Sequence, residues 1–109
     1  MNKRITIHTE NSIYVIDPEE VVFCQCEGAS IIIYLKNGEK LEIEKQMDAL
    51  EQVFKGSGFI RPHQDFLINR DYILRMDLAD GTLILTNQLK IPIEEKAQAE
   101  ILEFIRIIN

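Results

Sequence analysis

Hydrophobic and polar residues alternate with a period of two along most of this chain, which is the pattern of β-strands. Ile5 and Ile7, for example, alternate with Thr6 and His8. Turn-forming residues separate the short apolar runs. The pattern predicts strands at residues 5–8, 14–16, 21–26, 30–35, 41–43, 72–78, 82–86 and 89–93.

Two segments change to the helical period of about 3.6 residues. In residues 45–55, apolar side chains recur at helical spacing, and a Gly-Ser-Gly run follows as a stop signal. Residues 94–107 carry a broad apolar stripe with charged residues outside it. The sequence therefore predicts one short mid-chain helix and one C-terminal helix.

Some strands are apolar on one face and others on both faces, which indicates how the sheets stack. Residues 21–26 and 30–35 are apolar on both faces, so we expect both faces to be covered. Pro62 lies in the polar stretch 61–65, where it disfavours a central strand and predicts a loop or a broken strand. The predicted fold class is mostly β, with short antiparallel strands in stacked sheets, a β sandwich with two helices.

Length and composition favour one domain, spanning residues 1–109, with one hydrophobic core. The longest apolar stretches, such as residues 31–35, are too short to span a bilayer, and no signal peptide follows the basic N-terminus, so we expect a cytoplasmic protein. Cys24 and Cys26 fit reduced core thiols better than a metal site, because neither histidine is suitably spaced.

The net charge of −6 argues against nonspecific affinity for nucleic acid, which comes from basic surfaces. In residues 59–93, however, basic and acidic side chains balance, so the acidity lies mostly elsewhere. No nucleophile–base pair, phosphate-cradling glycine loop or metal triad is visible. The sequence therefore predicts no enzyme, no cofactor and no metal.

Residues 59–73, FIRPHQDFLINRDYI, place an aromatic residue, an arginine, a histidine, an asparagine and a late isoleucine at set distances: Phe59, Arg61, His63, Asn69 and Ile73. This segment resembles the LytTR family of bacterial DNA-binding domains, and the resemblance covers about residues 5–105. Supporting matches are Ile13 with Tyr14, residues 21–26, residues 35–38, the helix segment around Leu50, and residues 90–93.

The resemblance implies a LytTR-like β sandwich that grips duplex DNA through loops and not through a recognition helix. It implies sequence-specific binding for transcription regulation, as the output domain of a response regulator in a two-component system. Two copies would bind two direct repeats, as a homodimer on DNA. Members of the family usually carry this domain behind a receiver or a membrane segment, and neither is visible in these residues.

The resemblance and the side-chain chemistry together select the candidate DNA contacts. Arg61, Arg70, Lys90 and Lys96 would hold phosphates, while His63 and Gln64 would reach base edges in the major groove. Asn69 matches the family's asparagine. The alternatives are that His63 pins its loop by bonding to the backbone, that Asn69 closes a turn through its amide, and that Arg61 and Arg70 are solvated surface charges.

Several residues depart from the family's pattern and favour a second hypothesis. Asp65 would repel phosphate, and Glu94 and Glu95 place negative charge at the start of the last helix, where exposed amides would otherwise attract an anion. The loop at residues 27–30 offers little that could contact a base. The alternative function is a diverged LytTR-like module that has lost DNA binding and acts as a protein-interaction or inhibitory domain.

Overall fold

The structure, a computed structural model, describes residues 4–107. Its strands are β1 (Ile5–His8), β2 (Ile13–Ile16), β3 (Val21–Glu27), β4 (Ser30–Leu35), β5 (Lys40–Ile43), β6 (Phe59–His63), β7 (Phe66–Asn69), β8 (Ile73–Asp77), β9 (Thr82–Leu85) and β10 (Lys90–Pro92). Its helices are α1 (Met47–Val53), α2 (Gln98–Ile107) and the short 3-10 helices η1 (Pro18–Glu20), η2 (Arg70–Tyr72) and η3 (Glu95–Ala97). The predicted mostly β fold with one mid-chain and one C-terminal helix is confirmed.

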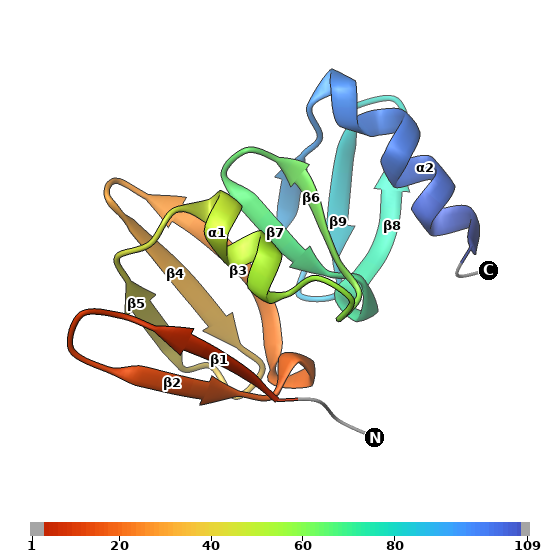
Figure 1. Cartoon of the computed structure of the whole chain (residues 1–109). Helices are drawn as coiled ribbons and strands as arrows, with labels where there is room; N and C mark the ends of the chain where they lie inside the picture. The colour runs from red at the N-terminus through yellow and green to blue at the C-terminus, as the bar shows by residue number, and fades with distance from the viewer. Residues whose placement is uncertain (1–3, 108–109) are drawn as a thin grey trace.

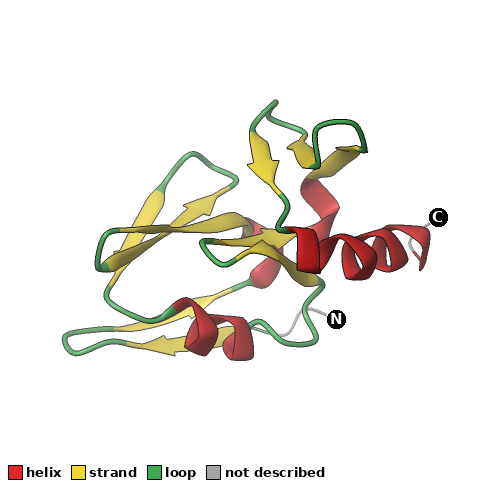
Figure 2. Ribbon diagram, turned by 90° about the horizontal axis from the view of Figure 1, so that it is seen from above, coloured by secondary structure: helices red, strands yellow, loops and turns green. Residues whose placement is uncertain are grey.

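The strands form three antiparallel sheets in the described residues. The largest has the order β5-β4-β3-β7-β6, and the others are the β1–β2 hairpin and a sheet of order β10-β9-β8. Figure 1 shows how the chain runs through them, and Figure 2 shows the hairpin with α1 on one side of the large sheet and the small sheet on the other. The predicted stacking of sheets is therefore confirmed.

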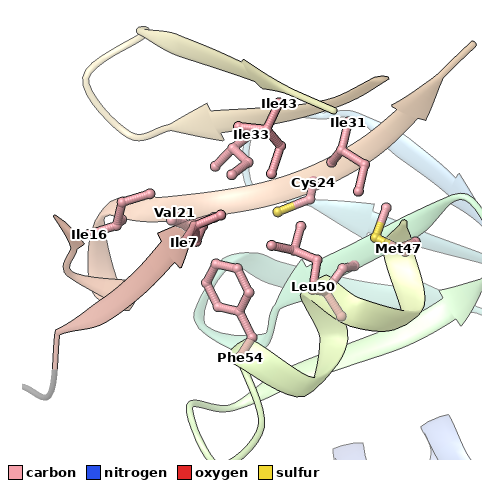
Figure 3. Packing of buried hydrophobic residues seen from close by; sticks show 11 residues of the cluster. Ile7, Ile16, Val21, Cys24, Ile31, Ile33, Ile43, Met47, Leu50 and Phe54 are labelled. Carbon is pink, nitrogen blue, oxygen red and sulfur yellow. The ribbon is translucent and has the colours of Figure 1, made fainter. Parts of the chain in front are cut away.

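Two apolar clusters fill the spaces on either side of the large sheet. Cys24 and Leu67 belong to the cluster against β1, β2 and α1, which Figure 3 shows from close by. Phe23 and Ile68, their chain neighbours, belong to the cluster against the small sheet and α2. Neighbouring residues of a strand point to opposite faces, so β3 and β7 supply both clusters. The expectation of one hydrophobic core was wrong, because the central strands are covered on both faces.

The segment around Pro62 is an irregular strand, which is the broken-strand alternative of the prediction and not the loop. β6 continues to His63, with an irregular register against β7 between Ile60 and His63. Since β6 is an edge strand, a residue without an N–H group is tolerated there. The carbonyl of Pro62 accepts a hydrogen bond from the backbone N–H of Glu94 (2.8 Å), which joins this edge to the segment before α2.

None of the helices in residues 4–107 combines the length and apolar character that a membrane-spanning helix requires. The C-terminal helix is shorter than expected, because η3 precedes it and α2 begins only at Gln98. The 3-10 helices were not predicted, since three residues are too few to establish a period.

Candidate nucleic-acid interface

Three chain segments lie in a row along the upper side of the molecule in Figure 1, with the β6–β7 turn in the middle. The N–H of Cys26, just before the β3–β4 turn, donates to the carbonyl of Asp65 in the β6–β7 turn (2.9 Å). The bond from Glu94 to Pro62 attaches the segment before α2 to the same turn. We call residues 27–30, 63–65 and 94–96 the loop face.

The β6–β7 turn is stabilised by its own histidine. His63 Nδ1 accepts a hydrogen bond from the backbone N–H of Asp65 (3.1 Å), and the ring meets Phe66 edge-on at 5.9 Å between centroids. A neutral imidazole whose Nδ1 accepts must carry its proton on Nε2. In residues 4–107 no hydrogen-bond partner of Nε2 is found. His63 therefore pins the turn and still has a donor for a ligand.

Gln64 and Lys96 are the exposed polar side chains that the fold brings together here. Gln64 follows His63 at the tip of the turn, and Lys96 lies in η3. Both line one polar hollow, which Arg61 and Glu100 also line. Within residues 4–107 Lys96 makes no ion pair, so its ammonium is available to an anion.

Arg61 reaches the same hollow but is bonded within the protein. One terminal nitrogen, Nη1, donates to Asp48 and to Glu51 of α1 (3.0 Å to Glu51), and Nη2 donates to the carbonyl of Gln64 (2.8 Å). Burial would lower the pKa of Arg61, but the hydrogen bonds to the two carboxylates outweigh it, and the pKa is raised. Its role as a phosphate contact stays a prediction, and this geometry favours a different role.

Asn69 lies inside the molecule, with 3% of its surface exposed. Its amide nitrogen donates to the carbonyls of Val21 (2.9 Å) and Pro18 (3.4 Å), and its amide oxygen caps η2 by accepting from the N–H of Asp71 (2.9 Å). This is the turn chemistry given above as the alternative, so Asn69 is not part of the interface proposed below.

Arg70 and Lys90 are exposed but do not belong to the loop face. Arg70 follows the far end of β7, where its guanidinium lies over the ring of Phe104 (5.9 Å to the centroid). Lys90 begins β10, at the end of that strand away from η3. Of the seven predicted contacts, the fold brings Arg61, His63, Gln64 and Lys96 together and leaves Asn69, Arg70 and Lys90 apart.

The loop face is acidic. Four carboxylates, those of Glu27, Asp65, Glu94 and Glu95, accompany a single ammonium, that of Lys96. The carboxylate of Glu27 accepts a hydrogen bond from the hydroxyl of Tyr34 (3.0 Å). The pKa of Tyr34 is raised, mainly by burial and then by this hydrogen bond and the negative charge of Glu27.

The two cysteines are free thiols beside this face. Cys24 is buried, and its burial, reinforced by Cys26, raises the pKa of its thiol. For Cys26, burial and the nearby carboxylate of Asp65 raise the pKa, although Arg61 opposes them. In the described residues, no group of three or more His, Cys, Asp and Glu side chains could hold a metal ion.

The family model of the LytTr DNA-binding domain matches residues 11–106. This chain belongs to the LytTr DNA-binding domain family.

Curated relatives of this LytTr domain include two sensory transduction proteins LytT. The protein from Oceanobacillus iheyensis is 30% identical over 70 residues, which cover 64% of this chain and 28% of that protein. The protein from Enterococcus faecalis is 27% identical over 105 residues, which cover 94% of this chain and 43% of that protein. The chain thus spans less than half the length of these relatives.

The fold of this LytTr domain is also found among solved structures. A chain described as the LytTr DNA-binding domain of a methyl-accepting/DNA response regulator from Bacillus cereus superposes with a TM-score of 0.74. It shares 14% sequence identity, and the match covers 94% of this chain and 95% of that one. At this identity the likeness shows the fold alone.

Sequence reasoning missed the two α1 carboxylates of this LytTr domain that bind Arg61. Asp48 and Glu51 are three residues apart in a predicted helix, so they share one of its faces. This spacing was a usable signal, but nothing in it indicated that the face would meet Arg61.

Proposed function

We propose that this LytTr domain binds duplex DNA sequence-specifically through its loop face, as the output domain of a transcription regulator in the bacterial cytosol. The observation that carries the proposal is the β6–β7 turn, which holds an exposed amide side chain, Gln64, on a backbone bonded to the segments on either side of it. An exposed amide on a fixed backbone suits a base edge in a groove.

Gln64 would read a base, and His63 and Lys96 would orient the domain. A glutamine amide pairs with the N6 and N7 groups of adenine through two hydrogen bonds. The Nε2 proton of His63 would go to a phosphate or to a base acceptor. Lys96 would hold a phosphate, and Arg70 and Lys90 stay predicted contacts to flanking phosphates outside the loop face.

Because the loop face is acidic, we infer that one copy binds weakly and depends on base contacts. Each phosphate contact contributes about 0.9 to the slope of log affinity against log salt, so the single ammonium of the loop face adds only one such contribution to those of the flanking Arg70 and Lys90. Two copies joined as a homodimer would raise the total affinity on two direct repeats, because the second copy then binds intramolecularly.

The test is enrichment of duplexes from a random pool at low and at physiological salt, with a Gln64→Ala variant beside the unmodified domain. Gln52→Ala, on the exposed part of α1, is the matched control. We expect one repeated motif to be enriched by the domain and by the control, and to be lost by Gln64→Ala. A folded domain that enriches nothing at either salt would sink the proposal.

A second candidate function is supported by the four carboxylates of the loop face. In this case, the domain has lost DNA binding and its loop face meets a basic surface of another protein. The same enrichment experiment separates the two functions, since this candidate predicts no motif at either salt.

A further inference from the structure

Arg61 joins the edge strand β6, the β6–β7 turn that follows it and the helix α1. Its side chain connects the edge strand β6 with two carboxylates of α1, and its second terminal nitrogen holds the carbonyl of Gln64. Arginine suits such a junction because its guanidinium offers five donors in a rigid plane. The turn that carries Gln64 is thereby attached to α1.

The burial of Arg61 sets it apart from a free phosphate contact. Only 18% of its side chain is exposed, whereas the side chain of its partner Asp48 is 87% exposed. Its Nε is buried and has no hydrogen-bond partner within the described residues. To meet a phosphate, the guanidinium would have to leave two carboxylates and would thereby strand their charges at the DNA surface.

We propose that Arg61 is a positioning residue for DNA recognition, which fixes the backbone of Gln64 against Asp48 and Glu51 of α1 and makes no phosphate contact itself. The carbonyl that it holds belongs to the residue that would read the base, so its bond sets the direction in which the Gln64 side chain leaves the turn. This role presupposes the proposed DNA binding and assigns α1 a part in it.

Removing the two carboxylates of α1 separates a positioning role of Arg61 from a simple effect of charge. Loss of positioning weakens DNA binding, whereas loss of negative charge strengthens it. In an Asp48→Ala, Glu51→Ala variant, two negative charges disappear near the loop face, and charge alone would raise the affinity for every duplex. Loss of positioning instead lowers the affinity for the enriched motif relative to a scrambled duplex. We expect this ratio to fall about tenfold, which is within the value of one bidentate base contact.

A matched control removes the same charge at the opposite end of the large sheet. Glu19 lies in η1 and Glu39 in the β4–β5 turn, and β3, seven residues long, separates η1 from the loop face by roughly 20 Å. The Glu19→Ala, Glu39→Ala variant should keep the ratio of the unmodified domain. A loss of fold in either variant would lower the active fraction for both duplexes equally, which leaves the ratio unchanged.

Arg61→Lys gives a second, independent readout in the salt dependence of binding. Lysine keeps the charge but cannot reach three acceptors in one plane. For a positioning residue, both Arg61→Lys and Arg61→Ala lower the motif-to-scrambled ratio and leave the salt slope unchanged. A phosphate contact predicts a slope smaller by about 0.9 for Arg61→Ala and little change for Arg61→Lys.

The outcomes distinguish this inference from the proposed function. If the unmodified domain prefers its motif and the Asp48→Ala, Glu51→Ala variant keeps that preference, Arg61 has no positioning role and the proposed function stands. If the unmodified domain shows no preference at all, the proposed function fails and the positioning role fails with it. If the Asp48→Ala, Glu51→Ala variant loses the preference for the motif and the Glu19→Ala, Glu39→Ala control keeps it, both the proposed function and the positioning role are supported.

Discussion

Asn69 shows how one buried amide can hold a junction of the backbone. Its oxygen caps η2 and its nitrogen bonds the Val21 carbonyl at the start of β3. We expect Asn69→Ala to lower the free energy of unfolding by about 1–3 kcal/mol, because buried backbone groups then lose their partners. Urea denaturation measures this value.

The control for that variant is Asn87→Ala. Asn87 also caps a turn through its side-chain oxygen, bonding the N–H of Leu89 (3.1 Å), but it is exposed, so water can replace the bond. Asn87→Ala should lower the free energy of unfolding by no more than about 0.5 kcal/mol. Equal costs for the two variants would contradict the assignment of Asn69 to folding.

The raised thiol pKa values make both cysteines poor nucleophiles. A thiol with a raised pKa carries less thiolate at pH 8 than a free cysteine, so we expect Cys26 to react slowly with iodoacetamide and Cys24 to react only on unfolding. Asp65→Asn should speed the reaction of Cys26, since it removes one cause of the raised pKa, but burial, the larger cause, remains. Timed alkylation with tandem mass spectrometry measures both rates, and an unchanged rate in Asp65→Asn would exclude this carboxylate as a cause.

At the scale of elements, the alternating pattern predicted most strands, but it left open whether residues 61–65 form a loop or a broken strand. The structure has the broken strand: β6 keeps Pro62 because it lies at a sheet edge, which only the sheet order reveals. The partners of Arg61 could not be predicted, because they are 10 and 13 residues away, on a helix whose docking the sequence does not show. That His63 and Gln64 lie together could be predicted, because the two residues are adjacent in the chain.

The segment before α2 places two carboxylates, those of Glu94 and Glu95, on the loop face, where they would repel the phosphates of DNA. Glu94→Gln with Glu95→Gln should raise the affinity for all duplexes alike, by about twofold per charge, as Coulomb's law gives for charges ~10 Å apart in water. Titrations at low salt measure the gain in affinity for the motif duplex and for the scrambled duplex. A gain confined to the motif duplex would contradict a purely electrostatic role of these carboxylates.

At the scale of the whole molecule, the two apolar clusters share β3 and β7, so we expect them to unfold together. Leu67→Ala opens a cavity in the cluster that faces α1, and Ile68→Ala opens one in the cluster that faces the small sheet. Each substitution should lower the free energy of unfolding by about 2–5 kcal/mol, and each should shift the same single unfolding transition. Denaturation followed by circular dichroism and by tyrosine fluorescence checks this, and two separate transitions would contradict the prediction of a single domain.

The acidity of the whole chain is consistent with recognition that depends on a few base contacts. With a net charge of −6, the domain lacks the general attraction that gives many DNA-binding proteins their affinity for any sequence. Composition could not locate the contact surface, since the loop face forms only when three distant turns are brought to one end of the fold.

Backbone amide chemical shifts during titration with the enriched duplex show directly whether this end of the molecule meets DNA. We expect the largest shift changes, among the described residues, at 27–30, 63–65 and 94–96, with residues 18–20 and 36–39 at the opposite end unaffected. Shift changes that centre on residues 18–20 and 36–39, and leave the β6–β7 turn unchanged, would place DNA at the opposite end and rule out the loop face.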